Sequence, residues 1–486
     1  MSQLGFGGCS SGASGTTSGG TLSQLIALGA ADTHLTANPC VTFWRLRIQK
    51  CTNFAMESIM QTYTGTAAWG SEVQITLNRT GDLVYWMYVL IDIPAIAALQ
   101  CPSGGNINVG SRCPPRSQFP YADVCNPCDD PKQEGICSPY GDPLSDDDDD
   151  EDDEFFDDID DCSGLRKPYA NWVNEIGFAA LQRVAFSIGG QVIDCLYSHY
   201  LHMWEELSGK PGKRLLEMIG KRFTRAHLVE DSQRDRRLYV PLPFYFTRHS
   251  GNALPLVSLQ FHSLQVHVTF APLSSLVQVS DCDVLVVKCA DGQPLGNNDM
   301  YSVLDTTYVY LDMEERDRFA VGSFQQLITQ VQQFSTTCNS ATIRATLNFN
   351  HPTLELIWAV QRQCQADANN TFDYWGAWGH DPITRAGLRI NNLPRFDREA
   401  TYFRLVQPYQ AHTNIPQGAI YVYSFALHPE DCQPSGSLNF SRIDNVEFSV
   451  DLQPAIATTN TALIVFARSF NILRFKEGLG GLLYSN

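Results

Sequence analysis

Residues 402–445 read YFRLVQPYQAHTNIPQGAIYVYSFALHPEDCQPSGSLNFSRIDN, and this stretch decides how the rest of the chain is interpreted. Residues 420–425 are β-branched or aromatic, a composition that fits a packed, pleated surface. Residues 433–436 have turn chemistry and end that strand, and residues 438–441 begin another extended segment. The stretch contains no recognisable reaction centre, and its composition predicts a layer of packed strands.

Length and composition predict large folded cores. A chain of 486 residues exceeds what one core usually organises, so two domains are the default expectation. Hydrophobic residues at 44% and aromatic residues at 11% exclude global disorder. The formal net charge of −18 repels phosphates, which argues against direct contact with nucleic acid.

Targeting signals are weak along the whole sequence. The N-terminus lacks the basic start and apolar core of a secretory signal, so we expect no secretion by a signal peptide. Residues 83–99 come nearest to a membrane span, but Asp92 and Pro94 interrupt them and their composition favours a buried strand. The 15 cysteines are scattered and odd in number, which favours reduced thiols.

Composition shifts divide the chain into an arm and two β-rich halves. Residues 1–31 are rich in Gly and Ser and predict a flexible N-terminal arm. Residues 32–322 and 323–486 then predict one β-sandwich each. Residues 101–162 interrupt the first half with Cys, Pro and an acidic block, and they predict a hydrated surface insertion.

Neither the cysteines nor the histidines predict a metal site. Cys125 and Cys128 form a single C-x-x-C without a second well-spaced pair, and the acidic block lacks the central glycine of a calcium loop. His199 and His202 lie three residues apart on a predicted helix, 198–208, without a third matching ligand. We therefore expect no metal and no cofactor.

Turn signals separate strand candidates at the spacing expected of a sandwich in both halves. Gly189-Gly190 predicts a tight turn between two of them. Strands are predicted at 73–77, 83–93, 183–188, 191–196, 264–270, 284–287, 306–311, 327–334, 342–348, 354–361 and 462–475. The predicted fold is all-β, with two tandem eight-stranded jelly-roll β-sandwiches, short helices and long loop insertions.

Several strings, in order along the chain, then carry a family resemblance. In the first half they are TNFAMES (52–58), NRTGDLV (78–84), SIGGQVID (187–194) and the helix MWEEL (203–207). In the second half they are VQPY (406–409), IYVYSFAL (420–427) and QPSGSLNFSRID (433–444). The chain resembles the double jelly-roll major capsid proteins of nucleocytoplasmic large DNA viruses, from about residue 39 to the C-terminus apart from the insertions.

The resemblance implies a structural protein of the virion. Three chains would form a homotrimeric, pseudo-hexagonal capsomer, and capsomers would tile an icosahedral shell assembled in the infected host cell. The implied partners are neighbouring trimers, minor capsid proteins, the penton protein and an internal viral membrane beneath the shell. The loops 101–162 and 362–386 would face outward, which would expose the glycosylation sequon at Asn369.

Two alternatives remain open at this point. The first is a minor or penton capsid protein. The second is a lectin-like tandem sandwich that binds carbohydrate through Trp375 and Trp378, beside Asp373, His380 and Asp381.

An enzyme is not expected, and we assign no catalytic residue. The sequence has no H-E-x-x-H and no P-loop. The G-x-S-x-G string at residues 8–12 lies in a Gly/Ser-rich arm without the flanking strand and helix that a nucleophile elbow needs.

Overall fold

The computed structural model describes residues 50–100, 169–280, 284–457 and 459–484, together with 27, 29–36, 38 and 43. Two compact units, Met1–Thr52 and Asn53–Asn486, divide the chain. In the first unit a short helix, α2 (Asp32–Thr36), is described. The insertion predicted at 101–162 and most of the arm predicted at 1–31 lie outside the described residues. The larger unit contains both β-rich halves.

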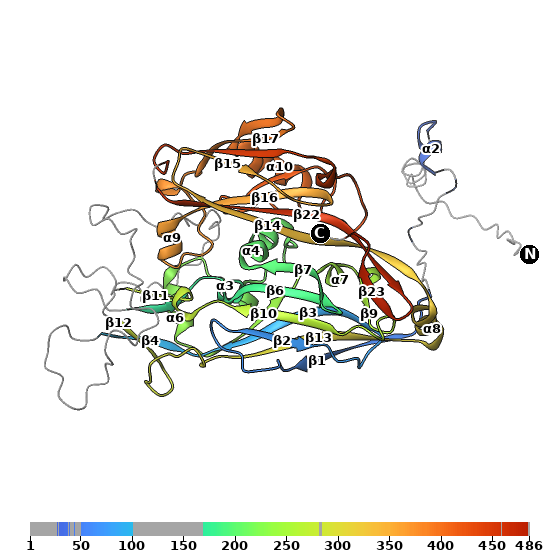
Figure 1. The fold of residues 1–486 in the computed structure, drawn as a ribbon, viewed down its shortest axis with the longest axis horizontal. Coiled ribbons are helices and arrows are strands. Elements are labelled where there is room, and N and C mark those ends of the chain that lie inside the picture. The colour runs from blue at the N-terminus through green and yellow to red at the C-terminus, as the bar shows by residue number, and fades with distance from the viewer. Residues whose placement is uncertain are drawn as a thin grey trace, which may run out of the picture. The chain divides into compact units, whose positions relative to one another are not determined.

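Two antiparallel sheets form the first jelly roll (Figure 1). We call them sheet 1 and sheet 2. Sheet 1 has the order β1 (Phe54–Gln61), β13 (Tyr301–Leu311), β3 (Leu83–Ile93) and β8 (Arg236–Pro241). Sheet 2 has the order β2 (Glu72–Thr76), β10 (Leu264–Phe270), β6 (Leu181–Ile188) and β7 (Gln191–Tyr197).

The second jelly roll repeats this order with later strands. Sheet 3 has the order β14 (Phe324–Cys338), β22 (Thr461–Lys476), β16 (Pro352–Arg362) and β19 (Tyr421–Ser424), with β20 (Leu438–Asn439) on β16 and β23 (Leu479–Leu482) on β22. Sheet 4 has the order β15 (Thr342–Thr346), β21 (Val446–Leu452), β17 (Ile383–Ile390) and β18 (Leu393–Glu399). The predicted all-β double jelly roll is therefore confirmed.

Short elements extend these sheets and connect them. Extra strands raise the number of described strands above eight in each half. In the first half β4 (Ile96–Gln100) pairs with β12 (Val284–Lys288), β5 (Ala170–Trp172) with β11 (Val277–Val279), and β9 (Leu254–Pro255) with β3; in the second half the extra strands are β20 and β23. The helices are α3 (Ile176–Ala180), α4 (Ser198–Ser208), α5 (Leu216–Ile219), α6 (Arg225–Ser232), α7 (Tyr245–Arg248), α8 (Met313–Val321), α9 (Gln363–Asp367) and α10 (Gln407–Ala411). Short 3₁₀ turns lie at Ser250–Asn252, Leu273–Ser275, Ala377–Gly379 and Phe440–Arg442.

Hydrophobic alternation explains the strands that the sequence located well. In β10 and β21 every second residue is buried, which is the pattern of a sheet with one face on a core. Gly189 and Gly190 both have positive φ, at 57° and 84°, as the hairpin between β6 and β7 requires. Residues 83–99 form the strands β3 and β4, as predicted. Among the described residues no helix is long and apolar enough to cross a membrane.

The beginning of residues 402–445 differs from the prediction of a strand. Tyr402–Val406 forms one π-helical turn, η6, which continues into α10. Phe403 is fully buried there, and its ring packs edge-on against Trp358 of β16 at 5.2 Å. Burial of this ring inside the second roll outweighs the strand propensity of the local sequence.

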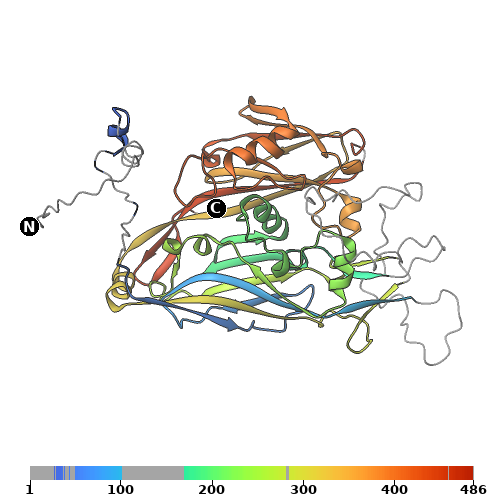
Figure 2. The ribbon, with the colours of Figure 1, turned by 180° about the vertical axis from the view of Figure 1, so that it is seen from behind.

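The four sheets are stacked in the order 1, 2, 3, 4, which both views of the ribbon display (Figures 1 and 2). The chain passes from sheet 1 to sheet 3 through α8, which joins the last strand of the first roll to the first strand of the second. Buried residues of both rolls belong to one continuous hydrophobic cluster. The junction between sheets 2 and 3 is therefore part of the core.

Candidate functional site

The junction between the two jelly rolls is organised around helix α4. Its sequence SHYLHMWEELS places Leu201, Trp204 and Leu207 at helical spacing, and all three are buried. The helix directly follows β7 at the end of sheet 2 and reaches sheet 3. The ring of Tyr200 lies edge-on to Phe466 of β22, with 5.5 Å between centroids. One helix of the first roll thus supplies aromatic packing to the central strand of the second.

Trp204 of α4 lies close to two arginines. The guanidinium carbon of Arg248 is 4.1 Å from the Trp204 ring centroid, and that of Arg468 is 4.3 Å away. Cation–π contacts of this kind are strongest when water is excluded. Arg468 lies on β22 and is 1% exposed, so this contact is fully desolvated and links the rolls.

Arg468 also belongs to a buried charged cluster formed by side chains of the second roll. Its Nη1 lies 2.8 Å from Oε1 of Glu355, a β16 residue with no exposed surface. Nε2 of His412 lies 2.9 Å from Oε2 of the same carboxylate, and Nδ1 of His412 lies 3.0 Å from Oε1 of Glu430. The Arg468 side chain additionally donates to the carbonyl of Pro429. Two carboxylates therefore face two cationic groups in this part of the core.

The pKa values in this cluster follow from burial and from these charges. Burial alone would raise the pKa of Glu355, but Arg468 and His412 outweigh it and lower that pKa to about 2. Burial would lower the pKa of His412, but Glu355 and Glu430 raise it to about 9. Both groups are consequently charged at neutral pH, and each depends on the other for compensation of its burial.

A second charged cluster holds α4 to its own roll. Glu175 is buried and has a left-handed backbone, with φ 54°. Its carboxylate contacts Nδ1 of His202 at 2.7 Å and Nζ of Lys221 at 2.8 Å. Burial would raise the pKa of Glu175, but His202 and Lys221 lower it to about 2. Lys221 also pairs with Glu206. The helix is thereby fixed by charge on the side of the first roll.

Two loops of the second roll complete the contacts of α4. The His202 ring stacks on Phe372, with 4.5 Å between centroids, and Nδ1 of His199 lies 2.8 Å from the hydroxyl of Tyr374. At the end of the helix, the backbone N–H of Asn414 donates to the carbonyl of Leu207 at 2.9 Å. Both histidines are thus engaged in packing and hydrogen bonding at the junction.

The edge strands β7 and β14 meet directly beside this helix. The backbone N–H groups of Val331 and Cys195 both donate to Oδ1 of Asp194, each at 2.9 Å. Burial raises the pKa of Asp194 to about 7, even though both hydrogen bonds favour the charged form. The Gln330 side chain donates to the carbonyl of Ile193. The rolls are therefore joined by backbone-directed hydrogen bonds as well as by aromatic packing.

Asn369, predicted to be an exposed glycosylation sequon, is instead buried. It is 6% exposed, and its Nδ2 donates to the carbonyls of Ser274 at 2.7 Å and Val277 at 2.8 Å. Both acceptors belong to the first roll, so Asn369 is a contact of the junction. The prediction of an exposed side chain is wrong, because a segment about 90 residues away in sequence covers it.

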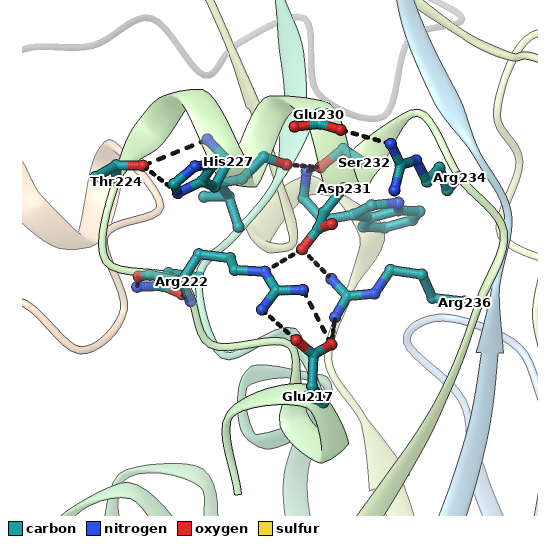
Figure 3. Close-up of polar contacts among 12 residues, drawn as sticks. Glu217, Arg222, Thr224, His227, Glu230, Asp231, Ser232, Arg234 and Arg236 are labelled. Carbon is teal, nitrogen blue, oxygen red and sulfur yellow. Dashed lines mark hydrogen bonds and ion pairs between the residues drawn. The ribbon is translucent and has the colours of Figure 1, made fainter. Parts of the chain in front are cut away.

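A further ion network fixes the insertion between β7 and β8 (Figure 3). Arg222 pairs with Glu217 through two hydrogen bonds and with Asp231 through its Nε. Arg236 of β8 approaches Asp231 at 3.3 Å. The N-terminus of α6 is capped by Thr224, whose hydroxyl accepts from the N–H of His227. Glu217 is exposed, so this network orders the insertion more than it stabilises the core.

Trp375 and Trp378, the two tryptophans of the lectin-like alternative, do not lie on one shared exposed face. Trp375 packs against the hydrophobic core, and the guanidinium of Arg404 lies over its ring at 5.4 Å. Asp381 is paired with Arg404 and accepts a hydrogen bond from Tyr421. Trp378, in contrast, is 60% exposed and has φ 55°. The loop is therefore pinned to the second roll by its polar and aromatic residues.

Within the described residues, no group of three or more His, Cys, Asp or Glu side chains is placed to hold a metal ion. The cysteines at 101–162 lie outside the described residues.

Sequence reasoning missed the buried ion pair of sheet 3, whose arginine also contacts Trp204 of the first roll. Glu355 and Arg468 each stand alone in an apolar run, LELIWAV in β16 and IVFARSF in β22. A single charge within a strand that is otherwise apolar needs a buried partner, and that signal was present. The sequence did not show which residue the partner is, because the two residues are far apart along the chain.

The fold and the junction define the class of protein first. Two jelly rolls of identical strand order are fused face to face, and aromatic and charged side chains connect the first roll to sheet 3 of the second. This is the architecture of a structural, wall-building double jelly roll.

Comparison with known proteins defines the family. Residues 315–481 match the family model described as "Large eukaryotic DNA virus major capsid protein", and residues 42–106 and 159–312 match "Major capsid protein N-terminus". The major capsid protein of Pyramimonas orientalis virus is 32% identical over 495 residues, covering 96% of this chain and 100% of the relative. That of Paramecium bursaria Chlorella virus 1 is 30% identical over 523 residues, with 96% and 100% coverage. This chain belongs to the family of major capsid proteins of large eukaryotic DNA viruses.

Solved structures agree with this assignment. A chain of the "PBCV-1 virus capsid, quasi-atomic model" superposes with a TM-score of 0.67 at 25% identity, covering 92% of this chain and 100% of that one. The Faustovirus major capsid protein shares the fold, with a TM-score of 0.65 at 12% identity over 94% and 96% of the two chains. The protein is a structural capsid protein and not an enzyme.

Proposed function

We propose that three copies of this chain assemble into a homotrimer of pseudo-hexagonal outline and that these trimers tile the faces of an icosahedral shell. The observation that carries the proposal is the repeated order of the sheets. Each chain contains two rolls of the same topology stacked in the same direction, so three chains supply six equivalent walls. A ring of six such walls has the outline that close packing in a shell requires.

We propose the domain boundaries that accompany this role: an arm at 1–31, a first jelly roll at 32–322 and a second at 323–486. Strand pairing supports the last boundary, because strands up to β13 pair among themselves, as do strands from β14 onward. Helix α8 lies between the two sets. The arm would run beneath the shell toward minor capsid proteins, the penton protein or an internal membrane.

We propose that one end of the larger unit faces outward. The strands β4 and β5, which flank residues 101–168, lie at the same end as α9 and the loop that follows it (Figure 1). The amide of Gln278, beside β5, donates to Oδ1 of Asn370 at 2.6 Å, which supports this common location. Long loops are tolerated at a surface and suit the exterior of the virion. The net charge of −18 supports a shell without direct contact to nucleic acid.

Native mass spectrometry and negative-stain imaging of the purified full-length chain test the proposal. We expect three copies per particle and a hexagonal outline of the particle. A protein that stays monomeric at micromolar concentration would contradict it. A ring of five copies would instead support a penton protein, although a chain with two rolls favours the trimer.

A further inference from the structure

Arg248, the last residue of α7, carries a positive charge at the junction of the rolls that has no direct partner. Its guanidinium carbon lies 4.1 Å from the ring centroid of Trp204. Among the described residues, no carboxylate lies within ion-pairing distance of this guanidinium and no acceptor within hydrogen-bonding distance of its N–H groups. An arginine stays charged in proteins and offers only donors. The side chain therefore presents unused donors in a position that Trp204 fixes.

The charged cluster beside Trp204 is already balanced without Arg248. Glu355 and Glu430 supply its negative charges, and Arg468 and His412 supply an equal number of positive charges. Glu355 also attracts Arg248, but from beyond ion-pairing distance. Arg248 therefore adds a positive charge in excess to this part of the junction.

Asp194 is a further carboxylate that acts on Arg248, again from beyond ion-pairing distance. Its Oδ1 accepts from the backbone N–H groups of Val331 and Cys195 instead. Burial and the like charge of Arg468 outweigh these distant attractions and lower the pKa of Arg248 to about 10. An unpaired charge that is largely removed from water is costly, so this guanidinium calls for an anionic partner.

The guanidinium of Arg248 is open to solutes, whereas that of Arg468 is not. Arg468 is 1% exposed, and its Nε is fully buried without a hydrogen-bond partner. Arg248 is partly exposed, and its nitrogen atoms remain accessible. Cys432, in the loop 427–436 of the second roll, is a partly buried free thiol close enough to act electrostatically on Arg248. An accessible donor group thus lies between the two rolls.

We propose that Arg248 binds a small oxyanion of the phosphate class at the junction between the two jelly rolls. A guanidinium held against an aromatic ring keeps the N–H groups at its edge free, and their planar fork matches two oxygens of such an ion. The bound anion neutralises the excess charge and stabilises the packing of α7 and α4 against β22. All of these groups belong to one chain, so the site does not depend on the proposed trimer.

A titration of the full-length protein with inorganic phosphate tests the site. At pH 7 and constant ionic strength, the midpoint of thermal unfolding should rise by about 1–3 °C and level off by about 50 mM phosphate, because a ligand of the folded state stabilises it by mass action. General exclusion of phosphate from the protein surface would raise the midpoint without levelling off. Sodium chloride at the same ionic strength should not reproduce the rise.

Substitutions of Arg248 test which group holds the anion. Arg248→Gln should abolish the saturable rise. Arg248→Lys keeps the charge but lacks the planar fork, so half of the rise should require at least about 10-fold more phosphate. The matched control is Arg234→Gln, which removes an exposed arginine paired with Glu230 and should retain the wild-type response. Circular dichroism verifies that each variant is folded.

The thiol of Cys432 gives a second readout that does not depend on unfolding. Phosphate bound at Arg248 should slow the alkylation of Cys432 by iodoacetamide at least about threefold, because it restricts access to the neighbouring thiol. Cys338, a partly buried free thiol at the end of β14, is the internal control and should react at an unchanged rate. Peptide mass spectrometry measures both rates in one sample.

The outcomes decide the inference without reference to the number of copies in the particle. A midpoint that does not rise with phosphate, or that rises equally with sodium chloride, overturns it. A saturable rise that persists in Arg248→Gln also overturns it, because the anion would then bind elsewhere. Equal protection of Cys338 and Cys432 overturns it as well, since the whole fold and not this site would have responded.

Discussion

Sheet 1 and sheet 3 occupy equivalent positions in two copies of one fold, yet they face different surroundings. In sheet 3 the central strands carry a charged pair, Glu355 and Arg468, and both residues are buried. In sheet 1 the corresponding strand β3 carries Asp92, which pairs with Arg237 at 2.7 Å where solvent still reaches both groups. The topology is the same, and only the covering layer differs.

The layer that covers a sheet, and not the jelly roll itself, therefore sets the free-energy cost of a charged residue on that sheet. A buried carboxylate needs a full set of cationic partners, since desolvation outweighs a single imperfect contact. An exposed pair at the same level of the fold contributes little, because water already solvates both members. Substitutions at equivalent positions should therefore have unequal effects.

The largest expected effect comes from removing the buried charge of sheet 3. Glu355→Gln leaves Arg468 and His412 in the core without their carboxylate. We expect a loss of about 3–5 kcal/mol in the free energy of unfolding, as for other broken buried pairs. Denaturant unfolding at pH 7 measures it. The matched control is Asp92→Asn in sheet 1, which should change the stability by a small fraction of that amount. Equal losses in both variants would contradict the role assigned to the cover.

The next effect is a pH dependence that arises from His412. Its pKa is raised from the ordinary value to about 9, so the folded state binds this proton more tightly than the unfolded state does. The stabilisation is complete below about pH 6.5 and is lost as the pH rises through 9.

We expect the free energy of unfolding to decrease by about 2 kcal/mol between pH 6.5 and 9.5, and the denaturant concentration at the midpoint of unfolding to fall with it. His412→Gln should remove this slope, although it lowers stability at pH 6.5. A variant that retained the wild-type slope would show that other groups cause it.

The pKa of Asp194, at the edge between the rolls, is raised, whereas the pKa of the buried carboxylate of Glu355 is lowered. Burial raises its pKa to about 7, so the folded state takes up a proton that the unfolded state releases near pH 4. Its contribution to stability therefore declines as the pH rises from about 4 through 7. We expect Asp194→Asn to stabilise the protein by about 1 kcal/mol at pH 8 and to have almost no effect at pH 4. The measurement is the thermal unfolding midpoint of both proteins at the two pH values. A larger stabilisation by Asp194→Asn at pH 4 than at pH 8 would contradict the prediction.

Much of the fold was predictable because it is written in local patterns. The strand 83–93 and the helix 198–208 were located to the residue, since an apolar run bounded by turn formers and a helical repeat ended by glycine are local signals. The failure at Tyr402–Val406 has a non-local cause. Phe403 enters the core beside Trp358, and no neighbour in sequence announces that contact.

The site was much less predictable than the fold. Asn369 looked like an exposed sequon because Asn-Asn-Thr is polar and lies in a long loop. Its burial depends on carbonyls at Ser274 and Val277, which reach it only after both rolls have formed. The cluster of Glu355, His412 and Arg468 likewise joins three distant segments. Pairing of this kind is decided by the three-dimensional arrangement, which the periodicity of one sequence does not contain.

The smallest expected effect sharpens the comparison between the two sheets most directly. If the apolar face of sheet 1, where Phe54, Met56 and Met60 are exposed, is covered in the trimer as that of sheet 3 is covered in the chain, then hydrophobic burial holds the copies together. Such burial is hardly screened by salt, whereas exposed ion pairs are. We therefore expect the trimer to persist from 0.1 M to about 1 M NaCl, by native mass measurement or light scattering, with an unchanged dissociation constant. Dissociation to monomers at molar salt would mean that charges hold the trimer, and sheet 1 would then be covered by a different kind of contact from sheet 3.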